Sequence, residues 1–315
     1  MARQALIAVG AGLTSALASL AFIAGAPFAL TLVYLAPLPM MMAGLALGFR
    51  ATVFGSLAGF MTIGMFGGMT SAAIFGLVHA LPALMVVNLA LMKREPPEGG
   101  TVWFPPGPIA AMLAVLGAGF LVSAALMVAS GPGLQGLITA HLGEAFTMMA
   151  PNMPEESRRQ VAGMLAPLFP GAVSASWVIM AVINATLAQG LVVRMGHNLR
   201  PSPAYAAFDL PMWLSWPLVG AAAVALAGSG EWEYAGRNVA MILAVPYFLL
   251  GLAVVHTLAR RVAFTGPLLV AFYLVIVVSL WAALVVAGIG VVEQWIGLRG
   301  RNAPPPSPHG GGGTT

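Results

Sequence analysis

Long apolar runs, separated by short polar breaks, extend along nearly the whole chain. A helix needs about 20 consecutive apolar residues to cross a bilayer. Runs of that kind lie near 4–25, 28–48, 51–67, 70–92, 108–130, 171–195, 212–228, 237–259 and 266–288. The pattern predicts an all-α fold, a polytopic transmembrane helical bundle of about nine spans that forms one domain over residues 1–300. The first run is long for the apolar core of a signal peptide and further spans follow it, so we expect it to be a transmembrane helix.

The one sizeable loop, residues 131–170, carries a helical pattern of its own. Its first half repeats apolar residues at intervals of three and four, including Leu134, Ile138 and Leu142. This spacing predicts an amphipathic insert that lies on the membrane or caps the bundle on the extracytoplasmic side. Asn152 and Glu155 have the spacing of a capping box, which predicts a second short helix. The tail 301–315 is rich in Pro and Gly and is expected to be disordered.

Composition agrees with a membrane setting. Charged residues make up 7% of the chain, hydrophobic residues 60%, and the mean hydropathy is +0.94. No soluble core hides that much apolar surface, so the lipid bilayer is the expected partner of most side chains. The net charge is +4, but the basic residues stand singly or in pairs beside the spans rather than in a patch, so no nucleic-acid partner is expected.

The basic residues instead indicate an orientation. Cytoplasmic loops of membrane proteins carry an excess of Lys and Arg. With a cytoplasmic N-terminus, eight of the 13 basic residues fall on the cytoplasmic side: Arg3, Arg50, Lys93, Arg94, Arg194, Arg200, Arg260 and Arg261. The remaining five are then outside: Arg158, Arg159, Arg237, Arg299 and Arg301, the last two because an odd number of spans places the C-terminal segment there. We therefore expect a multi-pass protein of the bacterial cytoplasmic (inner) membrane with its N-terminus in the cytoplasm.

Polar groups inside the apolar runs are the candidate ligand-binding residues. His79, Asn184 and Tyr247 stand near the middle of three runs, and Tyr34 is a weaker candidate. A polar group in a span needs a partner away from lipid or lines a cavity. If these groups converge, they suit a small neutral or weakly polar solute; the alternative is hydrogen bonding across the bundle. His256 stands at the expected cytoplasmic edge, where we expect it to be solvated.

The first run also carries two faces of small residues. Small side chains at four-residue spacing let membrane helices approach closely. One face holds Ala8, Gly12 and Ala16, and a neighbouring face holds Ala11, Ser15 and Ser19. These faces predict either packing within the bundle or a docking site for another membrane protein, such as a coupling subunit or a second copy of the chain.

Enzymatic chemistry lacks its usual parts. The sequence has no cysteine, no His-Glu-x-x-His, no Gly-x-Ser-x-Gly and no phosphate-binding Gly-Lys-Ser/Thr loop, and no acidic residue stands centrally in a span. We expect no enzyme activity, no cofactor and no metal. The first hypothesis is a transporter or a transporter-like substrate-binding subunit, motivated by the spans and their uncharged interior groups. The alternative is a noncatalytic membrane scaffold or assembly partner.

Three segments carry a family resemblance. They are the hairpin Gly44-Leu-Ala-Leu-Gly48-Phe-Arg50, the helical insert, and the closing segment Gly288-Ile-Gly-Val-Val-Glu-Gln-Trp-Ile-Gly-Leu-Arg299. With these, most of residues 1–300 resembles the YybS-like bacterial integral membrane proteins of unknown function. That group is distantly similar to the substrate-binding S-components of energy-coupling-factor transporters, which typically have about six spans. The resemblance implies that the small-residue faces of the first helix dock on a transmembrane coupling subunit, and it implies no catalytic residue.

Overall fold

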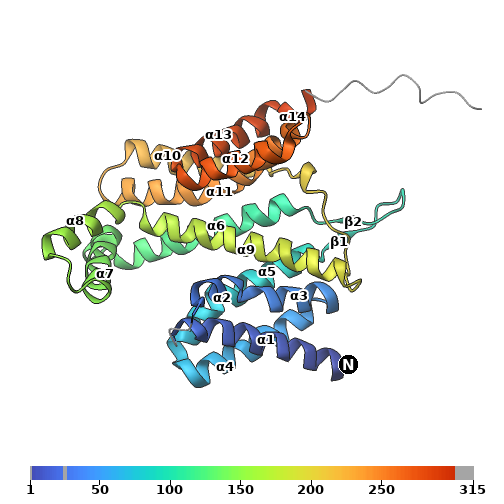
Figure 1. Ribbon diagram of the computed structural model, residues 1–315, viewed down its shortest axis with the longest axis horizontal. Coiled ribbons are helices and arrows are strands. Elements are labelled where there is room, and N and C mark those ends of the chain that lie inside the picture. The colour runs from blue at the N-terminus through green and yellow to red at the C-terminus, as the bar shows by residue number, and fades with distance from the viewer. Residues whose placement is uncertain (1, 24–26, 302–315) are drawn as a thin grey trace, which may run out of the picture.

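The computed structural model describes residues 2–23 and 27–301, and helices make up most of them (Figure 1). The long helices are α1 (Ala2–Ile23), α4 (Phe49–Phe75), α6 (Pro106–Val128), α9 (Phe169–Arg194) and α11 (Glu231–Ala259). The shorter α-helices are α2 (Ala29–Leu35), α3 (Pro37–Leu47), α5 (Leu81–Ala90), α7 (Gly133–Met149), α8 (Glu155–Leu165), α10 (Ser215–Ala227), α12 (Thr265–Val278), α13 (Leu280–Ile296) and α14 (Leu298–Arg301). A π-helix, η1 (Gly76–Ala80), joins α4 to α5, and η2 (Tyr205–Ala207) and η3 (Met212–Leu214) are 3₁₀ turns. Two two-residue strands, β1 (Lys93–Arg94) and β2 (Val102–Trp103), pair antiparallel.

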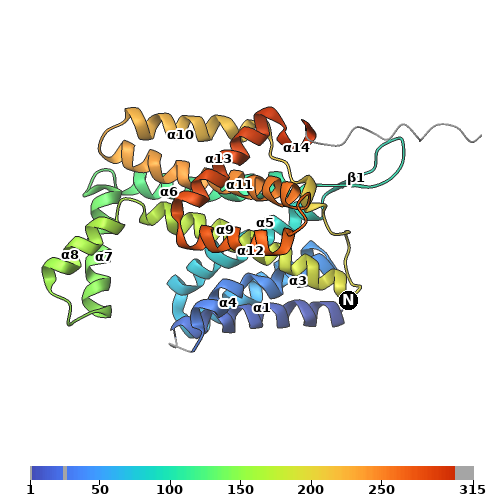
Figure 2. The same ribbon diagram turned by 45° about the horizontal axis from the view of Figure 1, so that its top comes forward.

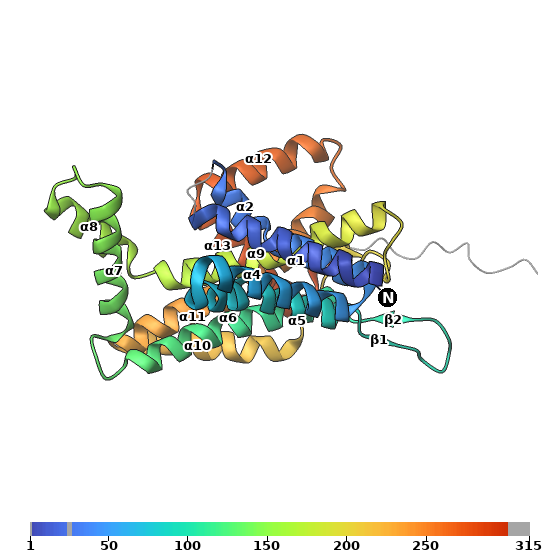
Figure 3. The same cartoon turned by 90° about the horizontal axis from the view of Figure 1, so that it is seen from below.

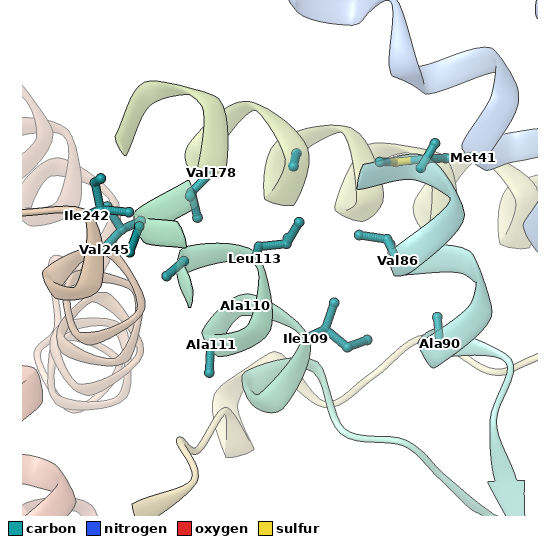
Figure 4. Close-up of a cluster of buried hydrophobic side chains, with 14 of the residues drawn as sticks. Met41, Val86, Ala90, Ile109, Ala110, Ala111, Leu113, Val178, Ile242 and Val245 are labelled. Atoms are coloured by element: carbon teal, nitrogen blue, oxygen red, sulfur yellow. The ribbon is translucent and has the colours of Figure 1, made fainter. Parts of the chain in front are cut away.

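The helices form three groups side by side (Figure 1). Helices α6 and α9 lie in the middle, α1 to α5 pack on one side of them, and α10 to α13 pack on the other through α11. Buried apolar side chains join the groups, and Figure 4 shows Met41, Val86, Leu113, Val178 and Ile242 turned toward the spaces between neighbouring helices. The bundle therefore has a continuous apolar core that runs through the middle pair.

Six helices are long and apolar enough to cross a membrane, and up to seven if the bent pair α12 and α13 counts as one span. The described residues confirm an all-α membrane bundle, but the expected count of nine spans is not confirmed. The run 212–228 contains only a shorter apolar helix, Met212–Ala227. The run 266–288 is divided between α12 and α13, and the chain bends by 115° between them.

The helical run Phe49–Ala90 counts once among the six, yet it reverses direction. At 42 residues it is about twice the length that a span requires. Gly68, at φ 82° and ψ 167°, breaks the helix. Beyond it the chain folds back, since a Cβ on Gly64 would lie 3.7 Å from Ala72 and a Cβ on Gly76 would lie 3.6 Å from Phe60. The positive φ is open to glycine at little cost, and it makes two antiparallel arms out of one run.

Both described ends of the chain reach the same end of the bundle. Figures 1 and 2 place the start of α1, the β1–β2 hairpin and α14 together at one end, which we call the basic end. The other end, where α7 and α8 leave the bundle, is called the insert end. An odd number of spans would have placed the C-terminal segment opposite the N-terminus, whereas the described residues bring both to the same end of the bundle. Because α12 and α13 run out and back as a bent pair, Arg299 returns to the side on which α1 begins.

The insert is helical, as predicted. Helices α7 and α8 pack against each other through Leu142, Ala162 and Ala166 and project from the bundle (Figure 3). The carboxylate of Glu231, at the start of α11, accepts hydrogen bonds from the backbone N–H groups of Leu134 (2.8 Å) and Gln135, so it caps α7 from another helix.

The predicted capping box at the second insert helix is wrong. Residue Pro154 stands at the N-cap of α8, and no side chain caps that helix. Asn152 precedes it in a turn that Met153 N–H closes on the Ala150 carbonyl. The proline fixes the extended backbone that precedes the helix, which leaves the side chain of Asn152 without a capping role.

At the insert end, α9 and α11 are held closely together. The Asn238 side chain accepts a hydrogen bond from Gly171 N–H (2.8 Å) and donates one to the Pro167 carbonyl (3.0 Å). The Tyr234 hydroxyl donates to the Ala166 carbonyl at 2.8 Å. Asn238 and Tyr234 are 0% and 3% exposed. Buried polar groups on α11 thus close this half of the bundle.

At the basic end, residues 195–214 form a crossing loop that spans the bundle from α3 to α13. Its Leu199 N–H donates to the Leu45 carbonyl (3.2 Å) at the end of α3. On the far side, Arg299 donates to the carbonyls of Ala206 (2.8 Å) and Phe208 (2.9 Å). The loop therefore links all three groups of helices at this end.

Candidate functional site

A cavity of about 600 Å³ opens among the middle helices and the crossing loop. Its walls come from α3, α5, α6, α9, α11 and α12 and from the crossing loop. Most of the lining is apolar, and Figure 4 shows Val86 of α5 and Ile109 and Leu113 of α6 on the shared inner side of their helices. The volume is in the range of small-molecule binding sites. This cavity is the candidate functional site.

The cavity occupies the half of the bundle next to the basic end. On α11 it runs from Leu249 to Arg260, and on α6 it runs from Pro106 to Leu113. At 1.5 Å per residue, the stretch on α11 is about 16 Å long. That is close to half of the roughly 30 Å hydrocarbon core, so the cavity has the depth of one leaflet.

Arg200 of the crossing loop is the buried charge of the cavity. The residue is 5% exposed, and its Nη1 donates to the carbonyls of Ala90 (2.8 Å) and Phe104 (3.2 Å). Its guanidinium carbon lies 5.8 Å from the centre of the Trp103 ring, a cation–π distance. Burial lowers the pKa of Arg200, yet the group stays cationic because its ordinary pKa is above 12.

The backbone of Arg200 is fixed as firmly as its side chain. Its carbonyl oxygen accepts hydrogen bonds from the amide groups of Gln189 (2.9 Å) and Asn198 (2.8 Å). Gln189 lies on α9 and also lines the cavity. Two amides therefore position a buried cation whose Nε has no acceptor within the described part of the chain.

Tyr205 in the crossing loop stands in the same wall. Burial raises the pKa of its phenol, and a hydrogen bond with Thr186 and the charge of Arg200 act in the opposite direction. A phenol with a raised pKa is neutral at pH 7, so Tyr205 offers a hydroxyl donor and acceptor beside the arginine.

The facing wall has polar groups from α11 and α12. The His256 Nδ1 lies 2.8 Å from the Leu252 carbonyl oxygen, and its Nε2 lies 3.2 Å from the Tyr273 hydroxyl. Arg260 follows one turn later at the rim, and it is exposed. His256 was expected to be solvated, but it is partly buried because α12 folds back over it.

This arrangement suits the binding of a mostly apolar ligand. No Asp or Glu lines the cavity, and the described residues contain no group of three or more His, Cys, Asp or Glu that could hold a metal ion. Apolar walls with a few polar groups at one end fix the orientation of an occupant.

Residues 12–293 match a family described as "Predicted membrane protein (DUF2232)". The chain belongs to this family. No curated protein and no solved structure matches the chain. Membership covers nearly all of the described helices, which makes the chain a multi-pass membrane protein of a family whose description gives no activity.

In this member of DUF2232, the candidate ligand residues do not meet at the cavity. Asn184 and Tyr34 come together, since the Asn184 amide donates to the Tyr34 carbonyl (2.7 Å) and the Tyr34 and Ser176 hydroxyls form a hydrogen bond. Tyr247 lies 3.1 Å from the Ser215 hydroxyl on the opposite side of the bundle. His79 is 4% exposed, on the π-helix, beside Phe75.

None of His79, Asn184, Tyr247 and Tyr34 lines the cavity. The contacts of Asn184 and Tyr247 are those of side chains that hydrogen-bond across a bundle, which was the alternative interpretation. A position in the middle of a span could not distinguish a ligand site from hydrogen bonding across the bundle. What a side chain faces depends on which side of its helix it lies on.

The small-residue faces of α1 lie inside the protein. Ala8, Ser15 and Ala16 are fully buried, and a Cβ added to Gly12 would overlap the Gly55 carbonyl of α4. Ala11 and Ser19 are half-buried. The face therefore packs on α4, which is the internal alternative. A partner that used it would have to displace α4.

The sequence interpretation missed Arg200, Tyr205 and Gln189. Arg200 was treated only as an orientation signal, although it stands six residues after Arg194 in a loop with three prolines, at 201, 203 and 211. That proline-rich, weakly charged loop between two spans was the available signal, because such a segment has extended backbone that can lie across helix ends.

Proposed function

We propose that the chain is a membrane transporter or a transporter-like substrate-binding subunit that takes a small, largely apolar solute into the cavity. The observation that supports this most is the cavity itself, since about 600 Å³ of mostly apolar space opens beside a hydrogen-bonding rim. A bundle with only a structural role has no need of such a space, because protein interiors are close-packed. The solute is neutral or weakly polar over most of its surface, as the walls are.

The proposed orientation places the basic end in the cytoplasm of a bacterial cell. Ten of the 13 Lys and Arg residues stand at this end, whereas only Arg158, Arg159 and Arg237 stand toward the insert end. The return of Arg299 and Arg301 to the basic end strengthens the charge bias beyond the eight residues of the sequence interpretation. The cavity then opens toward the cytoplasmic leaflet.

Filling the cavity is expected to abolish binding. On α9, Ala185 lines the cavity, whereas Ala172 of the same helix is exposed and does not. With 1-tetradecanol as the neutral probe, we expect the wild-type protein to bind one molecule and Ala185→Phe to weaken binding by about tenfold or more, since the ring takes the space of the solute. Ala172→Phe is the matched control and should bind like wild type.

Native mass spectrometry of the full chain released from micelles counts the bound probe. Counterflow of labelled probe in proteoliposomes then separates a transporter from a binding subunit. If wild type binds no probe, or if Ala185→Phe binds it unchanged, the solute-binding function is refuted.

The orientation has its own expected outcome. Because the chain has no cysteine, a single introduced cysteine reports without background. In intact spheroplasts, a membrane-impermeant maleimide should label Gln160→Cys in α8 and should label Glu98→Cys, in the β1–β2 connection, only after the membrane is permeabilised. The reverse pattern would place the basic end outside.

A second candidate, a noncatalytic scaffold, is favoured by the insert. Met148, Met149 and Met164 of α7 and α8 are 77%, 81% and 68% exposed, and exposed methionines suit an adaptable partner surface. Crosslinking from Gln160→Cys to native membranes tests it: a defined protein partner together with absent probe binding would favour the scaffold. A coupling subunit, as the S-component resemblance implies, would have to use a surface other than the buried face of α1.

A further inference from the structure

We propose that the cavity is built for a single-chain amphiphile with an anionic head, a carboxylate or a phosphate, which Arg200 binds while the tail lies along the apolar walls. The inference rests on the proposed solute-binding function and specifies its substrate class.

The first support is the state of the Arg200 guanidinium. Its Nη1 is occupied by the Ala90 and Phe104 carbonyls, whereas Nε is buried and has no acceptor among the described residues. The Nε–H group and the adjacent Nη2–H group form the edge that binds carboxylate or phosphate with two parallel hydrogen bonds. The protein therefore anchors the arginine by one side and leaves the Nε side for an anion.

The second support is the missing counter-ion. A buried cation is costly unless an anion pairs with it. Arg200 is 5% exposed, no described salt bridge includes it, and no acidic side chain lines the cavity. The nearest acidic residue along the chain, Asp209, bonds the backbone N–H of Leu210 instead. An anion from the ligand supplies the charge that the protein omits.

The third support is the arrangement of polar and apolar walls. Arg200, Tyr205 and Arg260 stand at the basic end, and Leu113, Val182 and Leu249 lie deeper in the bundle. The depth is about one leaflet, as derived from the helix rise. An amphiphile in that leaflet has its charged head at the depth of Arg200 and its tail at the depth of the apolar walls. It can therefore enter the cavity without turning over.

The experiment compares probes that share a tail or share a head. The full chain is equilibrated with myristate, tetradecyl phosphate, 1-tetradecanol or inorganic phosphate, and occupancy is measured by native mass spectrometry. We expect wild type to bind both anionic amphiphiles about tenfold or more tightly than the alcohol, because a charged hydrogen bond to the arginine adds that much affinity. Inorganic phosphate alone should bind far more weakly, because it lacks the apolar contacts.

Arg200→Gln should remove the preference for the anionic probes and leave tetradecanol affinity within about twofold. Arg200→Lys keeps the positive charge but cannot donate two parallel hydrogen bonds, so it should retain part of the preference for anionic probes. Arg261→Gln is the matched control, since Arg261 is exposed at the same end and does not line the cavity. Retained tetradecanol binding shows that a variant is folded.

Three outcomes would overturn the proposal. If wild type binds myristate and tetradecyl phosphate no more tightly than tetradecanol, there is no anion site, whatever the variants do. An anion preference that survives Arg200→Gln would place the site elsewhere. Tight binding of inorganic phosphate alone would identify a free anion, not an amphiphile, as the ligand. Loss of all binding in wild type would instead refute the proposed function.

Discussion

Replacing Gly12 by alanine is expected to destabilise the protein by about 2 kcal/mol or more. A methyl group there would overlap the Gly55 carbonyl oxygen of α4, and backbone cannot move aside as a flexible side chain does. Overpacking of this kind typically costs about 1–3 kcal/mol. The neighbouring contacts are also close, since a Cβ on Gly55 would lie 2.9 Å from the Ala8 carbonyl. The two helices thus have no slack along this contact.

Gly10 provides the control on the same helix. A Cβ at Gly10 has no atom within 4 Å, so Gly10→Ala should leave stability within about 0.5 kcal/mol or raise it through helix propensity. Unfolding of the purified protein in mixed micelles, followed by circular dichroism, measures both variants. Equal stabilities would mean that α1 does not pack on α4 through this face. A docking site for another membrane protein would then be the better interpretation of the face.

Glu293→Ala is expected to cost about 3 kcal/mol and to release the crossing loop. The Glu293 carboxylate is 5% exposed and accepts hydrogen bonds from Arg299 Nε (2.7 Å) and Arg299 N–H (3.2 Å). Without it, the largely buried guanidinium is left unpaired, and removing one partner of a buried pair typically costs about 3–5 kcal/mol. Arg299 also holds the Ala206 and Phe208 carbonyls, so the loss extends to the crossing loop.

Glu233 is the matched comparison for this ion pair. Glu233 and Arg237 pair one turn apart on α11, and their side chains are 41% and 42% exposed. Such surface pairs contribute about 0.3–0.5 kcal/mol, so Glu233→Ala should change stability little. Limited proteolysis should cut the crossing loop faster in Glu293→Ala only. Similar stability losses in the two variants would show that burial does not set the strength of the Glu293–Arg299 pair.

The positions of the helices were largely predictable from the apolar runs, because lipid requires long apolar helices wherever the chain crosses it. The turns were predictable only in part. The predicted runs 51–67 and 70–92 leave Gly68 between them, and Gly68 is the residue whose positive φ folds the chain back. The bend between α12 and α13 was not predicted, because the apolar sequence continues through it, and its direction decides the side on which Arg299 lies.

The candidate site was predictable only in kind. Apolar spans with few polar groups suggested a site for a small neutral or weakly polar ligand, and they directed attention to mid-span residues. Tyr247 instead bonds Ser215, which in turn donates to Gln294 (2.9 Å). The residues that do line the cavity include Arg200 and Tyr205, whose place depends on how a loop crosses the ends of helices distant in sequence. Long-range contacts of that kind leave no periodic trace in the chain.

The hydrogen-bonded contact of α9 and α11 closes the cavity on the side of the insert end. Pro246 lies on α11 between the closed half, with Asn238, and the open half, which begins at Leu249. A path for water or ions through the bundle would have to part the Asn238 contacts to Gly171 and Pro167. While those contacts hold, we expect the protein to conduct no current in a membrane under voltage, so that a cell could hold many copies of it without dissipating its proton gradient.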